Sequence, residues 1–176
     1  MGKLYFVEPS IEILKDIQQL KDEHIKNNEI TINGAVMLDQ MSVEDWLAFE
    51  HSCRSKDTVQ EGWVDAATAV AFDEDGIVGI INMRNYLNDF LRSYGGHVGY
   101  CVTPSRRGHG YAKEMLKHAL EYYRLHTNER KIMLSCDKDN IASKKTILAC
   151  GGEFEKEFLH EDGNVVEVYW ITINQI

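Results

Sequence analysis

The chain has 176 residues, of which 44% are apolar and 27% are charged, and it contains only two prolines. This composition excludes a wholly disordered chain and fits one domain that can bury a substantial core. The net charge of −9 argues against nucleic-acid binding, which normally uses a basic surface, although it could attract a cationic amine.

The first third of the chain predicts a strand followed by two helices. Ser10 is expected to cap the first helix, whose apolar residues recur at a spacing that places them on one face. Ser42 and Asp45 resemble a capping box, with Asp in place of Glu, and open the second helix. In chain order we expect a strand over 4–7, a helix over 10–27, a loop over 28–41, a helix from 42 and a loop over 53–63.

The rest of the chain combines two hairpins with alternating strands and helices. Asp73–Gly76 is a turn between two apolar strands, and Glu161–Asn164 gives a second hairpin signal. Asn140 can cap the last helix. We expect strands over 66–72 and 77–83, a short helix over 86–94, a strand over 97–102, a helix over 110–126, a strand over 131–136, a helix over 140–150, and strands over 154–159 and 165–173.

This order of elements predicts the fold class. It is typical of an α/β (α+β) fold with a mixed, mostly antiparallel central sheet of about seven strands and helices on both faces. The helix between the strands over 97–102 and 131–136 should make those two strands parallel. Because we find no internal repeat and no linker, we expect a single domain over 1–176.

The segment from Arg107 to Ala112 is the main chemical signal, since it lies between a strand and an amphipathic helix. Gly108 and Gly110 let the backbone pass close to a ligand. The first N–H groups of the helix lack internal partners and favour an anion, to which Arg107 can add charge-assisted hydrogen bonds. The third glycine of G-x-G-x-x-G is replaced by Lys113, and no P-loop is present. The segment therefore favours a ligand that carries a pyrophosphate but is neither a dinucleotide nor a nucleoside triphosphate.

With these residues the chain resembles the GNAT superfamily of N-acetyltransferases. The likeness is clear over about residues 64–173 and rests on element order alone before that. The matching segments are Arg107-x-x-Gly110-x-Ala112 with the coenzyme A loop, His97–Val102 with the fourth strand, Asn140-x-x-Ser143 with the start of the next helix, and Asp137–Lys145 with a group of predicted acetyltransferases of uncharacterised substrate.

The resemblance implies transfer of an acetyl group from acetyl-CoA to a primary amine by direct attack. It makes residues 1–63 the part that shapes the acceptor site and 64–176 the acyl-CoA-binding core. The pantetheine arm would lie like an added strand, and the N–H of Val102 would polarise the thioester carbonyl. The residues implied in coenzyme binding are Tyr100, Cys101, Val102, Arg107, Gly108, His109, Gly110, Tyr111, Ala112, Lys113, Asn140 and Ser143.

The resemblance also suggests catalytic residues. Members of the superfamily often place a Glu base where this chain has His97, and a His with a pKa of about 6.5 suits that role. Many carry a Tyr acid where this chain has Ile147. The thiolate must then be protonated by Tyr100, Tyr111, Cys136, another residue or water, or leave unassisted. Further candidates for substrate contacts are Glu50, His51, Glu61 and Arg84.

The family resemblance and the composition also predict the partners and the location of the protein. We expect a small-molecule or peptide amine as acceptor, no nucleic acid, no membrane contact, no metal, and a monomer or a homodimer. The lack of a signal peptide, a long apolar run or paired cysteine motifs favours a cytoplasmic protein. Three alternatives stay open: a non-catalytic acyl-CoA-binding or sensing module, a nucleotide-dependent transferase, and a structural or interaction protein without a ligand.

Overall fold

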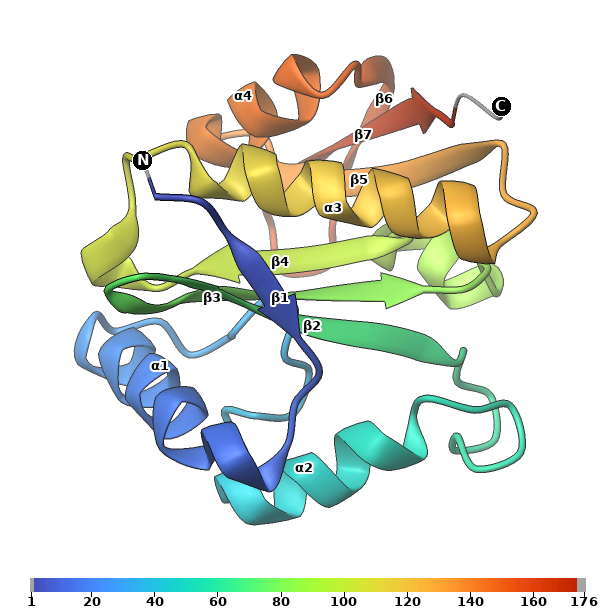
Figure 1. Cartoon of the computed structure of the whole chain (residues 1–176). Helices are drawn as coiled ribbons and strands as arrows, with labels where there is room; N and C mark the ends of the chain where they lie inside the picture. The colour runs from blue at the N-terminus through green and yellow to red at the C-terminus, as the bar shows by residue number, and fades with distance from the viewer. Residues whose placement is uncertain (1, 174–176) are drawn as a thin grey trace.

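The computed structural model describes residues 2–173 and shows an α/β fold whose seven strands form two sheets (Figure 1). The order is β1-β2-β3-β4 in the first sheet and β5-β7-β6 in the second, and all paired strands are antiparallel. The predicted fold class is confirmed, with the sheet split in two. The strands are β1 (Tyr5–Val7), β2 (Ala66–Asp73), β3 (Gly76–Arg84), β4 (Val98–Val102), β5 (Lys131–Asp137), β6 (Glu153–Leu159) and β7 (Val165–Thr172).

Helices cover both faces of the sheets, as predicted. Figure 1 shows α1 and α2 below the first sheet, α3 above it and α4 beside the second sheet. This arrangement buries the apolar faces of the sheets and leaves the ends of the strands accessible. The helices are α1 (Leu14–Lys26), α2 (Val43–Ser52), α3 (Tyr111–His126) and α4 (Ile141–Ala149), with short helical turns η1 (Ile11–Ile13), η2 (Leu91–Gly95) and η3 (Pro104–Arg106).

The two predicted serine caps have different outcomes. The Ser42 hydroxyl accepts a hydrogen bond from the N–H of Asp45 at 3.1 Å, so this cap of α2 is confirmed. Ser10 precedes the turn η1, and its side chain accepts no bond there. The α-helix itself begins only at Leu14, so the predicted Ser10 cap is wrong. The backbone at Ser10 is extended, which suits a chain entering a helix but does not aim the hydroxyl at its N–H groups.

Two apolar cores lie on opposite faces of the first sheet because side chains alternate along its strands. Ile81 of β3 belongs to the core that contains Met115 of α3. Its neighbour Ile80 belongs to the core that contains Leu20 and Trp46 of α1 and α2. All five side chains are at most 1% exposed. The alternation thus assigns each residue of the sheet to the α3 side or to the α1 and α2 side.

The strands β4 and β5 meet only near their first residues. The N–H of His97 donates to the carbonyl of Met133 at 2.7 Å, and the N–H of Met133 donates to Nδ1 of His97 at 2.8 Å. Within residues 2–173, no ladder pairs β4 with β5 beyond this contact. The two strands, which are joined through α3, therefore separate and leave one edge of β4 free.

The segment between β3 and β4 is fastened to the face of β5 that points away from α3. It contains the π-helical turn Leu91–Gly95 where a short helix was predicted. Nη1 of Arg84 donates to the carbonyls of Gly95–Gly96, both at 3.0 Å. The hydroxyl of Ser135 on β5 donates to the carbonyl of Tyr94. The guanidinium of Arg84, a predicted substrate contact, thus holds the backbone of this segment in place.

Candidate active site

The turn between β4 and α3 has the geometry that its glycines predict. Gly108 and Gly110 have φ of +83° and +78°, in the left-handed region that favours glycine. Among residues 2–173 the backbone N–H groups of 108–112 have no acceptor, whereas that of Lys113 donates to Gly110 at 3.1 Å. A row of free donors at a helix N-terminus concentrates positive potential. The turn therefore fits a diphosphate.

Both arginines of this turn are already paired with carboxylates. Arg106 forms an ion pair with the buried Asp73. Nη1 and Nη2 of Arg107 contact the two carboxylate oxygens of Glu29 at 2.6 and 2.8 Å, and its Nε donates to the carbonyl of Val102 at 3.0 Å. The hydrogen bonds from Arg107 lower the pKa of Glu29 to about 2. Arg107 can thus reach a phosphate only by giving up Glu29.

The register of β4 decides which of its peptide groups face the gap between β4 and β5. Bonds of 2.9 Å from the N–H of Thr103 to β3, and from β3 to the carbonyl of His97, mark hydrogen-bonded positions at both ends of β4. Such positions alternate in an antiparallel pair, so the peptide groups of Cys101 also face β3. The peptide groups of Tyr100 and Val102 face the free edge. The prediction for Cys101 does not fit this register.

Tyr100 and Ser143 connect the two sides of the gap. The Tyr100 hydroxyl lies 3.0 Å from the Ser143 hydroxyl on α4. The N–H of Ser143 donates to Oδ1 of Asn140 at 3.1 Å, so Asn140 caps α4. Burial raises the pKa of Tyr100 to about 12, and its hydroxyl is protonated at neutral pH. Ile147 is the fully buried residue of α4. The phenol of Tyr100 on β4 thus reaches α4 across the gap.

The other predicted proton donors are placed less favourably. The hydroxyl of Tyr111 donates to the carboxylate of Asp73, and the whole residue is buried. Cys136 belongs to the core beneath α3, where burial raises the pKa of its thiol to about 11. Tyr100 is therefore the predicted donor with the most direct access to the gap.

His97 lies at the closed end of the gap. Its ring is 1% exposed, and Nδ1 accepts the N–H of Met133 at 2.8 Å. The single proton of the neutral ring must therefore be on Nε2. Burial, together with the charges of Arg84 and Arg92, lowers the pKa of His97 to about 4. Neither nitrogen is free to accept a proton at neutral pH, so this geometry argues against the predicted role as base.

Asp137, at the end of β5, is a basic group that the sequence prediction did not include. The preceding Cys136 faces the α3 core, so the Asp137 side chain faces the opposite side. Partial burial and the charges of Asp139 and Asp162 raise the pKa of Asp137. Asp137 lies close enough to Tyr94 to raise the pKa of the Tyr94 hydroxyl, on the side of β5 that faces away from α3. The run of acidic residues after an apolar strand was the available signal.

Together these groups can hold an extended phosphate-bearing ligand and move a proton on either face of the gap. The turn offers backbone donors, β4 offers a free edge, and Tyr100 and Asp137 lie on opposite faces. Residues 2–173 contain no group of three His, Cys, Asp or Glu side chains placed to hold a metal ion. None of the helices in that range is long and apolar enough to cross a membrane.

Comparisons with known proteins agree with this geometry. The family model described as acetyltransferase (GNAT) domain matches residues 4–153. No sequence match was found among curated proteins.

Solved structures with this fold include several acetyltransferases. An acetyl transferase from Salmonella typhimurium that modifies the N-terminal serine of a ribosomal protein is 16% identical, with a TM-score of 0.69 over 99% of this chain and 97% of that chain. A ribosomal alpha-N-protein acetyltransferase in complex with coenzyme A is 17% identical, with a TM-score of 0.70 over 98% and 96%. Spermidine N-acetyltransferase from Vibrio cholerae, in complex with coenzyme A and spermine, is 16% identical, with a TM-score of 0.66 over 97% and 95%.

Proposed function

The chain belongs to the GNAT acetyltransferase family and uses acetyl-CoA, and we propose that it acetylates a cationic primary amine by direct attack in the gap between β4 and β5. One observation carries the proposal. The free N–H groups of residues 108–112 lead onto the free edge of β4, with Tyr100 of β4 facing α4 and Asp137 at the end of β5 facing the opposite side. We infer a continuous binding path that has a proton donor on one side and a proton acceptor on the other.

Acetyl-CoA fits this path through backbone groups of the turn and of β4, of which the carbonyl of Val102 already accepts a hydrogen bond from Arg107. The N–H groups of residues 108–112 would hold the diphosphate. Peptide groups of Tyr100 and Val102 would pair with the pantetheine arm as an added strand, beside Asn140 and Ser143. The N–H of Val102 would polarise the thioester carbonyl. Bound there, acetyl-CoA supplies an activated acyl carbon and a thiol leaving group.

We assign the proton transfers to groups on opposite faces of the gap. The amine nitrogen forms a bond to the acetyl carbon while the C–S bond breaks and its electron pair goes to sulfur. Asp137 takes the proton that the nitrogen loses, because its raised pKa makes it a stronger base. Tyr100 gives a proton to the sulfur, and Ser143 at 3.0 Å orients the hydroxyl. The acceptor thus enters from the face opposite α3 and α4.

The charge around Asp137 supports a cationic acceptor. Asp139 and Asp162 lie close enough to raise its pKa, and the chain carries a net charge of −9. The solved relatives act on amines of two kinds, a protein N-terminus and spermidine. We propose a small-molecule or peptide amine, acted on by a single-domain cytoplasmic enzyme that is a monomer or a homodimer.

A free-thiol release assay over a panel of amines tests the proposal. Polyamines, amino acids, aminoglycosides and peptides with free N-termini would each be mixed with acetyl-CoA and the enzyme. We expect thiol release with at least one cationic amine, and a thermal shift with acetyl-CoA but not with ATP or NAD. A shift with ATP and none with millimolar acetyl-CoA would contradict coenzyme binding and favour a nucleotide-dependent transferase.

A non-catalytic acyl-CoA-binding module is the second candidate. Ile147 in place of the superfamily's tyrosine and the occupied Nδ1 of His97 favour it. It predicts the same thermal shift with acetyl-CoA but no thiol release above the uncatalysed rate with any amine. Turnover that depends on Asp137 would exclude it.

A further inference from the structure

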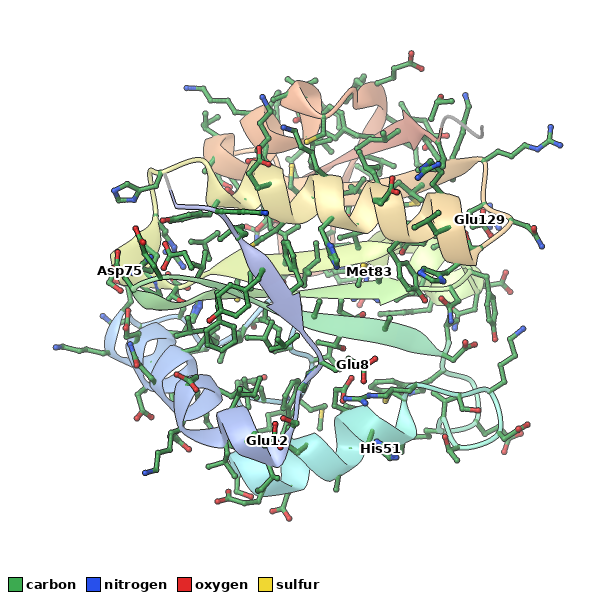
Figure 2. All side chains as sticks on the ribbon, viewed as in Figure 1. Glu8, Glu12, His51, Asp75, Met83 and Glu129 are labelled. Carbon is green, nitrogen blue, oxygen red and sulfur yellow. The ribbon has the colours of Figure 1, made fainter. Side chains whose placement is uncertain are left out.

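A cavity of about 230 Å³ lies at the closed end of β4, away from the coenzyme turn. Four segments line it: Leu87 and Arg92 before β4, His97, residues 129–131 at the start of β5, and Trp170 of β7. In Figure 2 this end is marked by Glu129, and the opposite end, near the coenzyme turn, by Asp75. The proposed reaction does not use this cavity.

His97 presents an unpaired donor to this cavity. The ring is 1% exposed, and its Nε2 has no hydrogen-bond partner among residues 2–173. The nearest carboxylate oxygen, Oε2 of Glu129, is 3.7 Å away, which is too long for a hydrogen bond. The bond from Met133 to Nδ1 fixes the proton on Nε2. A buried N–H of this kind normally has an acceptor, which can be an ordered water or an oxygen of a bound molecule.

Three cationic side chains surround the same space. Arg92, Arg130 and Lys131 line the cavity, and none of them forms an ion pair within residues 2–173. Glu129 is the one acidic residue among the lining residues. The balance of charge is therefore positive, in a chain whose total charge is −9.

We propose that this cavity binds the carboxylate or phosphate group of a small molecule, at a site separate from that of acetyl-CoA. The N–H of His97 and the cations match an oxyanion. Leu87 and the ring of Trp170 supply an apolar wall for the rest of the ligand. At about 230 Å³ the cavity has room for the anionic group of a small molecule and for part of its apolar remainder.

Two substitutions of His97 distinguish its Nε2–H donor from the hydrogen bond that its Nδ1 accepts from Met133. Asparagine places an amide oxygen near the position of Nδ1, where it can still accept the N–H of Met133, but it has no group at Nε2. Glutamine reaches the position of Nε2 with an N–H donor. We expect His97→Asn to weaken anion binding about tenfold and His97→Gln to weaken it by less than about threefold.

Surface substitutions test the charges without touching the core. Lys131 is exposed, so Lys131→Met should leave the fold intact and weaken binding about tenfold. Glu129→Gln removes the competing carboxylate and should tighten binding. Lys117→Met, on the exposed face of α3, is the matched control and should change nothing.

The experiment titrates the full chain, saturated with coenzyme A so that the coenzyme turn is occupied. Inorganic phosphate and acetate form separate arms at constant ionic strength, with chloride as the control anion. Imidazole ¹⁵N resonances locate the binding, and calorimetry gives the affinities of the variants. We expect a saturable shift of the His97 Nε2–H signal in at least one arm, and the tighter arm identifies the group.

Several results would overturn the proposal. One is a ¹⁵N spectrum that places the proton of His97 on Nδ1. Another is a shift of the His97 signal with chloride as large as that with phosphate or acetate. A third is an anion affinity that is the same as wild type in both His97→Asn and Lys131→Met. If coenzyme A does not bind at all, the proposed function fails. The acetate arm and the His97 resonance would still report on the cavity alone.

Discussion

The two ends of β4 offer donors of different kinds. At the end next to α3 the free donors are backbone N–H groups, and the nearby Arg106 and Arg107 are bound to carboxylates. At the other end the free donors are side chains, those of His97 and three unpaired cations. Asp75 and Glu129 mark these two ends in Figure 2.

This difference shows how each kind of site is encoded. Backbone donors need only a short local pattern, here two glycines before a helix. Side-chain donors need several segments to meet, and a neighbouring carboxylate can occupy them by forming an ion pair. Glu29 does this to Arg107, whereas Glu129 stays 3.7 Å from His97.

The largest expected effect concerns Asp137, at the end of β5. Asp137→Asn should lower kcat about 10²- to 10³-fold at neutral pH, since the amide cannot accept a proton. The raised pKa of Asp137 also predicts that wild-type kcat falls as pH drops through it, because the protonated acid is inactive. Steady-state thiol release at several pH values measures both. Asp139→Asn is the control and should change kcat by about threefold or less. Equal losses in the two variants would contradict the assignment.

Loss of the Tyr100 hydroxyl, on the other face of the gap, should lower kcat less than loss of the Asp137 carboxylate. Tyr100→Phe keeps the ring but removes the hydroxyl beside Ser143, and we expect kcat to fall about 30-fold. The loss is limited because a thiol with a pKa of about 8.5 is a tolerable leaving group without help. The KM for acetyl-CoA should change little. A large rise in KM at unchanged kcat would instead make Tyr100 a binding residue.

At the α3 end, a new negative charge should oppose the coenzyme. His109→Glu places a carboxylate beside the free N–H groups of residues 108–112, and we expect the Kd for acetyl-CoA to rise about tenfold. His51→Glu introduces the same charge on α2, labelled in Figure 2, far from the turn. Calorimetry should find that control within about twofold of wild type. Similar losses in both variants would indicate a long-range charge effect.

The ion pair at this end has a smaller expected effect of opposite sign. Glu29→Gln frees Arg107 to reach a phosphate, so acetyl-CoA should bind about fivefold more tightly. Because Arg107 lowers the pKa of Glu29 to about 2, the pair stabilises the fold above about pH 4.5 and is lost as pH falls toward 2. Urea unfolding should show the variant less stable at pH 7 and equal to wild type near pH 2. Unchanged coenzyme affinity would show that Arg107 serves only the fold.

The sequence predicted those features that depend on neighbouring residues. The left-handed Gly108 and Gly110, the Ser42 cap and the Asn140 cap each require contacts within a few positions along the chain. Such contacts leave a residue pattern that can be read directly. The order of strands and helices was predictable for the same reason, because hydrophobic periodicity is also local.

The remaining features depend on pairing between distant segments. Cys101 was grouped with Tyr100 because the pattern could not show which residues β3 would bond. The tautomer of His97 is fixed by Met133, a partner 36 positions away. Asp137 lies at the end of β5, where no ladder joins β5 to β4 among the described residues. No local pattern carries such long-range pairing, which is why the sequence predicted the conformation of the glycine turn better than the surroundings of His97 and Asp137.

The smallest expected effect tests the buried state of His97 at the other end. Its pKa of about 4 in the fold is below the usual 6.5, so the unfolded chain binds a proton first as pH falls. The contribution of His97 is therefore complete above about pH 6.5 and is lost on the way to pH 4. Between pH 7 and 6 the unfolding equilibrium constant should rise about threefold more in wild type than in His97→Asn. Equal slopes in urea unfolding would mean that His97 is protonated in the fold, and it could then no longer accept the N–H of Met133.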